Sequence, residues 1–372
     1  MVWLLLFAIF LILAILGWRV SDIVLKPAPY GLIEEFKIVD AADAEVTLPL
    51  PPNTKQFANT RREGRFGLVW EGGYGELGPI LRENETTLTR ELSNVVGDMP
   101  EADDAAQMDG FIYRRNPRED LGLEYQNLQL DGEVGPLRAW WLPGDKSVAV
   151  LMLHGRRRGE IIETLRVMPA LTSAGYSVLS LSYRNHTDSA ASPDGFYHYG
   201  DSEWRDVLTG LEFLREQGIE QVVLYGFSMG GAVAIEILKH YSAELPEIQA
   251  LIMDSPLLDP RTVFRLGARN SGLPLPHRTA DLALFVARLR AGIDWNAINQ
   301  VRYAPDLNLP TLLIAGTNDQ TTPIEMMDAF AANAPDIDYH RVEADHVESW
   351  NHDSKQYEAW LLEFLGEHAP LD

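Results

Sequence analysis

Cysteine is absent from all 372 residues of this sequence. A chain without thiols forms no disulfide bonds and offers no thiol nucleophile, no cysteine ligand for zinc and no attachment for an iron–sulfur cluster. Basic residues are scarce, because 31 Lys and Arg side chains stand against 54 Asp and Glu side chains, which gives a formal net charge of -23. A protein this acidic repels nucleic acid and anionic lipid as a whole, so sequence-independent DNA binding is not expected.

The chain also lacks the composition that is typical of disordered or fibrous proteins. Hydrophobic residues make up 46% of the chain and charged residues 23%, as in an ordinary globular protein. At 372 residues the chain is long enough for one large catalytic domain or two small ones. We therefore expect a folded protein with a sizeable hydrophobic core.

The N-terminus lacks charge over a long hydrophobic run. No Asp, Glu, Lys or Arg occurs from Val2 to Trp18, and a helix of this length reaches about 26 Å, just under the thickness of the hydrocarbon core of a membrane. We predict an uncleaved transmembrane anchor within residues 1–20 rather than a cleaved signal peptide or a buried helix, because no basic region precedes the run and no clear cleavage site follows it. Arg19 and Lys26 would keep the remaining chain in the cytoplasm by the positive-inside rule. Two charges are weak evidence for the orientation, because single-span enzymes with a large acidic domain are often exported. The sequence therefore does not decide on which side of the membrane the catalytic domain lies.

Proline and glycine punctuate the next part of the chain, residues 27–120. Neither LPLPPN at 48–53 nor RFGLVWEGGYGELGP at 65–79 shows a sustained helical period. We predict an N-terminal extension of short strands and loops here. The stretch 98–109 contains five acidic and no basic residues, and we interpret it as a solvated acidic linker, with a cation site as the alternative.

Short apolar runs alternate with longer amphipathic ones after about Gly122, which is typical of a mostly parallel sheet with helices on both faces. Eight strands are predicted, at 123–130, 137–143, 148–154, 176–183, 221–226, 248–254, 309–316 and 337–343. The first two flank Asp131-Gly132 and should form a half-exposed antiparallel hairpin, whereas the later ones are nearly continuous apolar runs, as strands buried on both faces must be. The main helices are expected at 201–216, 230–241, 324–333 and 354–367. This pattern predicts a catalytic domain over residues 121–372.

An interruption of the alternation falls at about residues 258–308. It contains amphipathic segments, including Thr279 to Gly292. Because open α/β sheets hold their sites outside the carboxyl ends of the strands, we expect this segment to form a small cap above the site.

A serine between glycines follows the predicted strand at 221–226. The sequence Gly226-Phe227-Ser228-Met229-Gly230 matches G-x-S-x-G and runs directly into a helical segment. A serine on such a sharp turn needs neighbours without side chains, because the backbone there is strained and crowded. The bare pattern occurs by chance, but its place between a buried strand and a helix predicts that Ser228 is a nucleophile rather than an ordinary turn serine.

An acid and a histidine follow the serine in the order that this geometry requires. Asp319 comes shortly after the apolar strand LPTLLIAG, so its carboxylate should project from the carboxyl end of the sheet. His346 follows the strand IDYHRVE on a short loop. From there it would take the proton of Ser228 while Asp319 holds its other nitrogen.

Two other residues compete for these roles. Asp254 ends the preceding strand and is the alternative acid, in which case Asp319 would be a turn or helix-capping residue. His352 lies six residues after His346, beside the last predicted helix, and is the alternative histidine. In that case His346 would be a surface histidine.

Backbone N–H groups are the expected binding site for the negative charge that develops on a carbonyl oxygen under attack. Met229, the residue after the nucleophile, supplies one, and Arg156 in the loop after the third predicted strand supplies the other. Gly155 lets the backbone turn this amide inward. His154 is expected to brace the loop rather than to take part in the reaction.

Three consecutive arginines in this loop are unusual in so acidic a protein. Arg157 and Arg158 are candidate substrate-binding residues that would attract a carboxylate or phosphate on the substrate. The alternative is that the arginines form ion pairs with surface carboxylates such as Glu160 and Glu163.

With HGRRRG, GFSMGG, GTNDQTTP and ADHVES in this order, the chain resembles the α/β-hydrolase superfamily over residues 121–365. The runs Tyr183–His186 and Ser192–Asp206 make it similar to a bacterial, membrane-anchored branch, the Bem46-like serine hydrolases. The resemblance implies the α/β-hydrolase fold, with an eight-stranded, mostly parallel sheet, helices on both faces and a small cap. It also implies a serine hydrolase that works through an acyl-enzyme without a metal or an organic cofactor, with Ser228, Asp319 and His346 as the catalytic residues.

The expected activity is therefore hydrolysis of carboxylic esters by a protein tethered to a membrane through one N-terminal helix. The substrate would be a small-molecule or lipid-derived ester, and neither nucleic acid nor a protein partner is predicted. A serine peptidase, amidase or thioesterase is the alternative among enzymes, because these share the fold and the triad. A non-catalytic binding protein is the alternative outside enzymes, and an intact triad argues against it.

Overall fold

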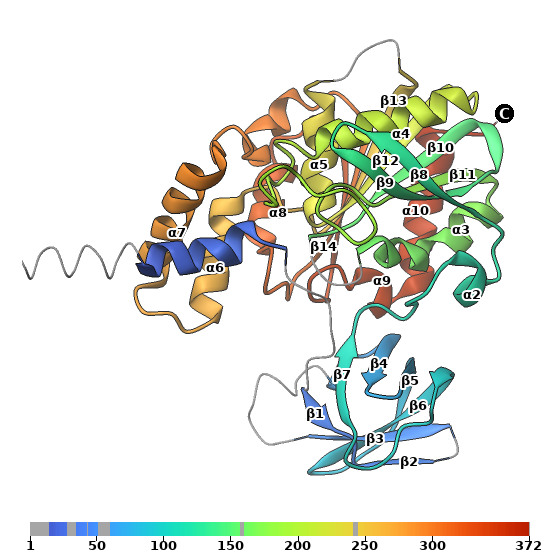
Figure 1. Cartoon of the computed structure of the whole chain (residues 1–372). Helices are drawn as coiled ribbons and strands as arrows, with labels where there is room; N and C mark the ends of the chain where they lie inside the picture. The colour runs from blue at the N-terminus through green and yellow to red at the C-terminus, as the bar shows by residue number, and fades with distance from the viewer. Residues whose placement is uncertain are drawn as a thin grey trace, which may run out of the picture.

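Two sheets divide the structure into a small and a large part (Figure 1). The computed structural model describes residues 15–27, 35–42, 44–50, 60–156, 160–240 and 245–371. The strands of the small part lie within residues 36–109, and those of the large part within residues 126–342. One hydrophobic core fills the small part, and two cores lie on either side of the large sheet.

The large part contains all eight predicted strands. They are β8 (Gln126–Gly132), β9 (Gly135–Leu142), β10 (Asp145–Leu153), β11 (Tyr176–Leu181), β12 (Gln221–Phe227), β13 (Glu247–Asp254), β14 (Thr311–Gly316) and β15 (Ile337–Val342). Their order across the sheet is β15-β14-β13-β12-β10-β11-β9-β8. β8 and β9 form an antiparallel hairpin and β9 is antiparallel to β11, whereas the pairs from β11 to β15 are parallel. The predicted hairpin and the parallel sheet that follows it are confirmed.

Alternate side chains of the central strands enter different cores on the two faces of the sheet. In β10, Leu151 and Leu153 belong to one core, and Val150 and Met152 belong to the other. The first face is covered by α4 (Trp204–Glu216), α5 (Met229–Leu238) and α8 (Ile324–Ala331), and the second by η2 (Glu160–Val167), α3 (Met168–Ser173) and α10 (Ser354–His368). Burial on both faces explains why β10 is apolar without interruption from Val148 to Leu153.

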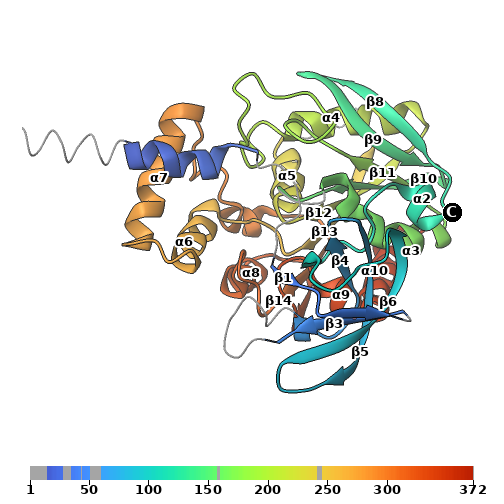
Figure 2. The same ribbon diagram turned by 60° about the horizontal axis from the view of Figure 1, so that its bottom comes forward.

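Two helices and a 3-10 turn form the cap predicted at 258–308. α6 (Pro260–Asn270) starts after the N-cap Asp259, and α7 (Pro276–Ala291) ends at Gly292, whose φ is 74°. η3 (Gln300–Asp306) leads back to the sheet. Figure 2 shows α6 and α7 at the opposite end of the large part from α2 (Pro117–Leu121) and α3.

A helix over residues 15–25 runs alongside α7 (Figures 1 and 2). A Cβ atom on Gly17 would lie 3.0 Å from Cγ2 of Val286, so the two helices approach closely at this glycine. Val24 and Leu25 are buried in the core of the large part. Most of the anchor predicted within residues 1–20, namely residues 1–14, lies outside the described residues, and within the described ranges no helix is both long and apolar enough to cross a membrane. The anchor stays a prediction.

The small part is more regular than the predicted extension of short strands and loops. Its strands are β1 (Phe36–Lys37), β2 (Asp40–Ala42), β3 (Glu45–Pro49), β4 (Phe66–Trp70), β5 (Gly73–Glu83), β6 (Thr87–Gly97) and β7 (Ala105–Asp109), paired antiparallel in the order β1-β7-β4-β5-β6-β3-β2. The end of the stretch 98–109, interpreted above as a solvated linker, is in fact β7, with Ala106 and Met108 in the core. Four of the five acids precede this strand, so the charge of the whole stretch concealed its apolar alternation.

Arg90 is fully buried inside the small part. Its guanidinium donates to the main-chain carbonyls of Gly78, Arg62 and Gly64 at 2.8 Å each and of Thr60 at 3.3 Å. Burial, together with the nearby Arg62, lowers the pKa of Arg90 to about 10. Three of the four carbonyls belong to residues 60–64, so Arg90 fixes the segment that carries Arg62 toward the large part.

Candidate active site

Ser228 occupies the turn between β12 and α5, with φ 49° and ψ -114°. A positive φ is strained for a residue with a side chain, and it marks this turn as unusual. A Cβ atom on Gly226 would lie 2.5 Å from the carbonyl carbon of Gly230, and one on Gly230 would lie 2.0 Å from the oxygen of Leu153. The turn therefore requires the glycines that the G-x-S-x-G pattern places around the serine.

Three predicted side chains from different segments meet at this turn. His346 Nε2 lies 2.9 Å from Oγ of Ser228, and His346 Nδ1 lies 2.8 Å from Oδ2 of Asp319. A neutral ring with its proton on Nδ1 donates to Asp319 and accepts the hydroxyl of Ser228. Asp319 follows β14 and His346 follows β15, so the carboxyl ends of two adjacent parallel strands bring these side chains together.

The loop after β14 holds the carboxylate of Asp319 in place. Oδ1 accepts the main-chain N–H groups of Thr321 and Thr322 at 2.7 Å each, and Oδ2 accepts the hydroxyl of Thr322 at 2.6 Å. The side chain is buried, like that of Thr322. These donors fix one orientation of the carboxylate, in which Oδ2 also faces His346.

Burial and charge act in opposite directions on the pKa of His346. Burial lowers this pKa, but the adjacent carboxylate of Asp319 raises it through its charge and its hydrogen bond, and the result is a pKa of about 9. Glu163 and Asp345 raise it further by smaller amounts. The neutral ring, which alone accepts a proton from Ser228, becomes the main form only as the pH rises past this value.

The two competing residues lie apart from this hydrogen-bonded series. Asp254 is fully buried and accepts the hydroxyls of Ser255 at 3.1 Å and Tyr357 at 3.0 Å. Burial raises its pKa. His352 is exposed at the end of α9 (Ser349–His352). Among the described residues, Asp319 and His346 are therefore the acid and the histidine that hydrogen bonds connect to Ser228.

The two predicted N–H donors flank Ser228. Met229 is the first residue of α5, where a main-chain N–H has no acceptor within the helix. Arg156 follows β10 and, together with Gly155, lines the cavity beside the serine. A Cβ atom on Gly155 would lie 3.3 Å from Cβ of Ser228, so this loop passes close to the nucleophile. Their binding of an oxyanion remains a prediction.

His154 lies fully buried at the start of the same loop. Its ring stacks on Tyr183 with the centroids 4.5 Å apart, and Nδ1 lies 2.8 Å from the carbonyl oxygen of Gly155. The hydroxyl of Tyr183 donates to the carbonyl oxygen of His154 at 2.6 Å. Burial holds the pKa of His154 well below its usual range, so the ring stays neutral. These contacts are those of a bracing residue.

Glu163 is not the surface partner of the arginines that the sequence suggests. Its side chain is buried, accepts the N–H of Gly155 and lines the cavity beside Ser228 and His346. Burial raises the pKa of Glu163 to about 7 against the opposing charge of Arg166. The surface assignment is wrong because η2 is enclosed nearly all round, with Ile161, Glu163, Thr164, Leu165, Arg166 and Val167 buried.

Arg157 and Arg158 lie outside the described residues. Their contact with an anionic substrate, or with a surface carboxylate, therefore stays a prediction.

Ser228 and His346 line a cavity of about 550 Å³. Four segments form most of its wall: the helix over residues 15–25 with Val20, Ile23 and Val24; the small part and the chain after it with Arg62, Met108 and Phe111; α6 with Val263, Phe264 and Ala268; and α7 with Ala280 and Ala283. A mainly apolar cavity of this size suits a small ligand with a few polar groups. The contributions of the N-terminal helix and of the small part have no signature in the sequence.

Arg156 joins the N-terminal helix to the site. Its guanidinium donates to the carbonyl oxygens of Ile23 at 2.5 Å and Val24 at 2.6 Å, at the end of the helix where cations are favoured. The guanidinium of Arg156 also lies over the ring of Tyr199, 5.3 Å from the centroid. The hydroxyl of Tyr199 donates to the carbonyl oxygen of Val24. We call the contact of Arg156 with Ile23 and Val24 the clamp. No local sequence pattern indicates it, because Arg156 and Val24 are 132 residues apart.

The small part supports the loop that carries His346. Arg62 forms an ion pair with Glu348, two residues after the histidine. The side-chain amide of Asn351 donates to the carbonyls of Arg65 and Gly110, at 2.8 Å each. The position of the histidine loop is thus fixed from the small part as well as from the sheet.

Comparison with known protein families matches two segments of the chain. The alpha/beta hydrolase family matches residues 150–361, which is more than half of the chain. A domain of unknown function, DUF8805, matches residues 37–109, which correspond to the small part.

Curated proteins and solved structures give further similarities. A carboxylesterase of Bacillus subtilis is 30% identical over 95 residues, which are 25% of this chain and 36% of that protein. The lysophosphatidylserine lipase ABHD12 of Danio rerio is 26% identical over 211 residues, 52% of this chain and 50% of that protein. The chain thus spans about a third to a half of the length of these relatives. The structure of an esterase of Pyrococcus furiosus has a TM-score of 0.55 and 24% identity, covering 69% of this chain and 96% of that one, and it shares the fold.

Proposed function

This chain belongs to the alpha/beta hydrolase family, and from that premise we propose that it hydrolyses carboxylic esters through an acyl-enzyme. Ser228 is the nucleophile, His346 is the general base, and Asp319 orients His346. The observation that supports this proposal most directly is the hydrogen-bonded series of these three side chains at the wall of a cavity of about 550 Å³.

The proposed reaction begins when Oγ of Ser228 attacks the ester carbonyl carbon while Nε2 of His346 takes the hydroxyl proton. Asp319 holds the ring and stabilises the imidazolium that forms. The N–H groups of Met229 and Arg156 bind the negatively charged oxygen. His346 then returns the proton to the leaving alcohol as the C–O bond breaks, and a water molecule activated by the same ring hydrolyses the acyl-serine.

We also propose that an N-terminal anchor within residues 1–20 holds the protein at a membrane, where it acts on a small or lipid-derived ester. The uncharged run from Val2 to Trp18 supports the tether. The similarity to a protein named as a lysophosphatidylserine lipase supports a lipid-derived substrate. The proposed reaction uses no cofactor, and the net charge of -23 argues against nucleic acid as a partner.

A fluorophosphonate probe tests the nucleophile, because it reacts covalently with an activated serine. We expect the full-length wild-type protein to be labelled and Ser228→Ala to show no labelling above background. Ser271→Ala is the matched control, since Ser271 also lines the cavity but has no histidine beside it among the described contacts. Labelling that survives in Ser228→Ala, or a folded wild-type protein that takes no label, would contradict the assignment.

The pKa of His346 predicts the pH dependence of turnover. The reaction needs the neutral ring, and Asp319 raises the pKa of His346 to about 9 against the effect of burial. For a substrate limited by acylation, kcat/KM should therefore rise about tenfold per pH unit below that value and level off near it. Initial rates from pH 6 to 10, corrected for spontaneous hydrolysis, check this prediction. A profile that is flat between pH 6 and 8 would exclude His346 as the base.

A further inference from the structure

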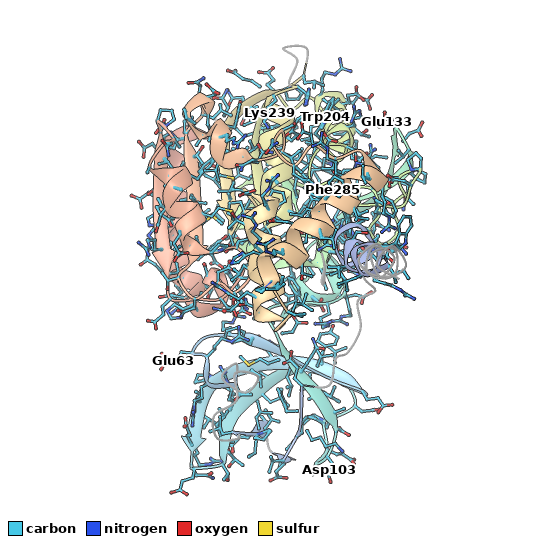
Figure 3. All side chains as sticks on the ribbon, turned by 90° about the vertical axis from the view of Figure 1, so that its left-hand side faces the viewer. Glu63, Asp103, Glu133, Trp204, Lys239 and Phe285 are labelled. Atoms are coloured by element: carbon cyan, nitrogen blue, oxygen red, sulfur yellow. The ribbon has the colours of Figure 1, made fainter. Side chains whose placement is uncertain are left out.

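Large hydrophobic side chains are exposed together on the N-terminal helix and α7. Ten such side chains are exposed among the described residues, and seven of them belong to this one region: Ile15, Leu16, Trp18, Ile23, Leu275, Phe285 and Leu289. Leu289 is 70% exposed and Phe285 is 59% exposed. We call these seven residues the apolar face. Figure 3 looks onto this side of the molecule, with Phe285 labelled on α7.

Direct contacts make the two helices one surface. Arg290 of α7 lies over the ring of Trp18, 4.1 Å from the centroid. The same guanidinium donates to the hydroxyl of Ser21 at 2.6 Å and pairs with Asp22 at 2.8 Å. These contacts come in addition to the close approach at Gly17, so the exposed apolar residues are carried by two helices that pack directly against each other.

Basic residues outnumber acidic ones in the two segments that carry the apolar face, against the trend of the whole chain. Residues 15–27 and 275–291 together carry five basic and two acidic residues, whereas the complete chain carries 31 and 54. Asp22 and Asp281, the two acids, are both paired with arginines. The region is thus locally cationic and apolar, which is the combination that binds the surface of an anionic bilayer.

The apolar face lies one helix away from the cavity. α7 presents Ala280 and Ala283 to the cavity, and on the other side it leaves Phe285 and Leu289 exposed. Ile23 belongs both to the cavity wall and to the apolar face. The helix over residues 15–25 also continues directly from the uncharged run that starts at Val2.

We propose that the apolar face docks on the surface of an anionic lipid bilayer and that the cavity receives its substrate, an amphiphilic ester, from that surface. The proposal rests on the membrane tether and the esterase activity proposed above, and it adds a second contact with the bilayer that the tether alone does not require. Phe285 and Leu289 enter the boundary between headgroups and acyl chains, and the exposed Arg19, Arg278 and Arg288 contact the headgroups.

The absence of cysteine makes a depth measurement straightforward, because Phe285→Cys and Leu289→Cys each carry one thiol in the full-length protein. Each variant is labelled with an environment-sensitive fluorophore and bound to vesicles of phosphatidylcholine and phosphatidylglycerol, with or without bromine on the lipid acyl chains. We expect brominated lipid to quench both probes at least twofold. Leu81→Cys is the matched control, since Leu81 is an exposed leucine of the small part, and its probe should not be quenched.

Flotation of the vesicles distinguishes failure of the docking proposal from failure of the membrane tether. Protein that floats with the vesicles while the probes at 285 and 289 stay unquenched would overturn the docking proposal and leave the tether intact. Protein that does not float would overturn both. Energy transfer between probes on different copies, without quenching by lipid, would show that a second copy covers the face and would also overturn the proposal.

A kinetic comparison tests delivery of the substrate. The double variant Phe285→Ser/Leu289→Ser should hydrolyse an ester embedded in anionic vesicles at least fivefold more slowly, while its rate on a short water-soluble ester stays that of the wild type. Leu81→Ser should change neither rate. An equal loss on both substrates would assign the two residues to the packing of the cap, and no loss on either would show that delivery does not use this face. Fluorophosphonate labelling of the double variant reports the activated serine independently.

Discussion

Replacing His346 with alanine should lower kcat/KM for an activated ester by about 10⁴-fold or more. This side chain contacts both of the other members of the series, at 2.9 Å from Ser228 and 2.8 Å from Asp319. Without it the hydroxyl of Ser228 has no base, and the imidazolium that would protonate the leaving alcohol does not form. Initial rates on a chromogenic ester, compared with the wild-type protein at equal concentration, measure the loss.

The control for this prediction is His352→Ala. His352 is exposed on the same stretch of chain, at the end of α9, and lines a second cavity instead of the one beside Ser228. Its removal should change kcat/KM by less than about threefold. If the two variants lose activity to the same extent, the base has been assigned to the wrong histidine.

Replacing Asp319 with asparagine should lower kcat by about 10³-fold to 10⁴-fold. An amide at this position no longer stabilises the imidazolium, and it favours the wrong tautomer of His346. The pH profile should shift as well: the Asp319 carboxylate raises the pKa of His346 against the effect of burial, so without it this pKa falls and the inflection moves to lower pH. The residual activity should then level off at a lower pH than the activity of the wild-type protein.

Asp254→Asn is the matched control for the carboxylate. Asp254 is the alternative acid one strand earlier, but it accepts the hydroxyls of Ser255 and Tyr357. We expect less than a tenfold change in kcat and an inflection that stays near pH 9. A larger kinetic loss in Asp254→Asn than in Asp319→Asn would exchange the two roles.

The fold of the large part could be predicted because strands that are buried on both faces of a sheet have apolar residues at successive positions. β10 from Val148 onward and β14 after Thr311 are uninterrupted apolar runs, since neighbouring residues enter different cores. The small part could not be predicted to the same degree. Its longest strands, β5 and β6, pair through several register shifts, and such bulges break the period of two that identifies a strand.

Some residues of the candidate site could likewise be predicted from the sequence, and others could not. Ser228, Asp319 and His346 follow strands whose carboxyl ends meet at one edge, so their proximity follows from the order of the elements. Glu163 was misplaced because charge in a sequence indicates exposure, and only the enclosed packing of η2 reverses that. Val24 and Arg62 line the cavity beside Ser228 because segments distant in the sequence come into contact. No periodic pattern of residues in the sequence indicates such contacts.

The clamp between Arg156 and the N-terminal helix makes the cavity beside Ser228 depend on residues 15–25. A chain that starts at Pro27 would lack Val20, Ile23 and Val24 from the cavity wall, and the guanidinium of Arg156 would lose both of its carbonyl acceptors. The main chain of the same arginine is the proposed donor to the oxyanion. Removing the proposed tether together with this helix would therefore also remove part of the cavity wall beside Ser228. If the proposed tether is right, the residues that directly follow it, 15–25, would also complete the wall of the cavity beside Ser228.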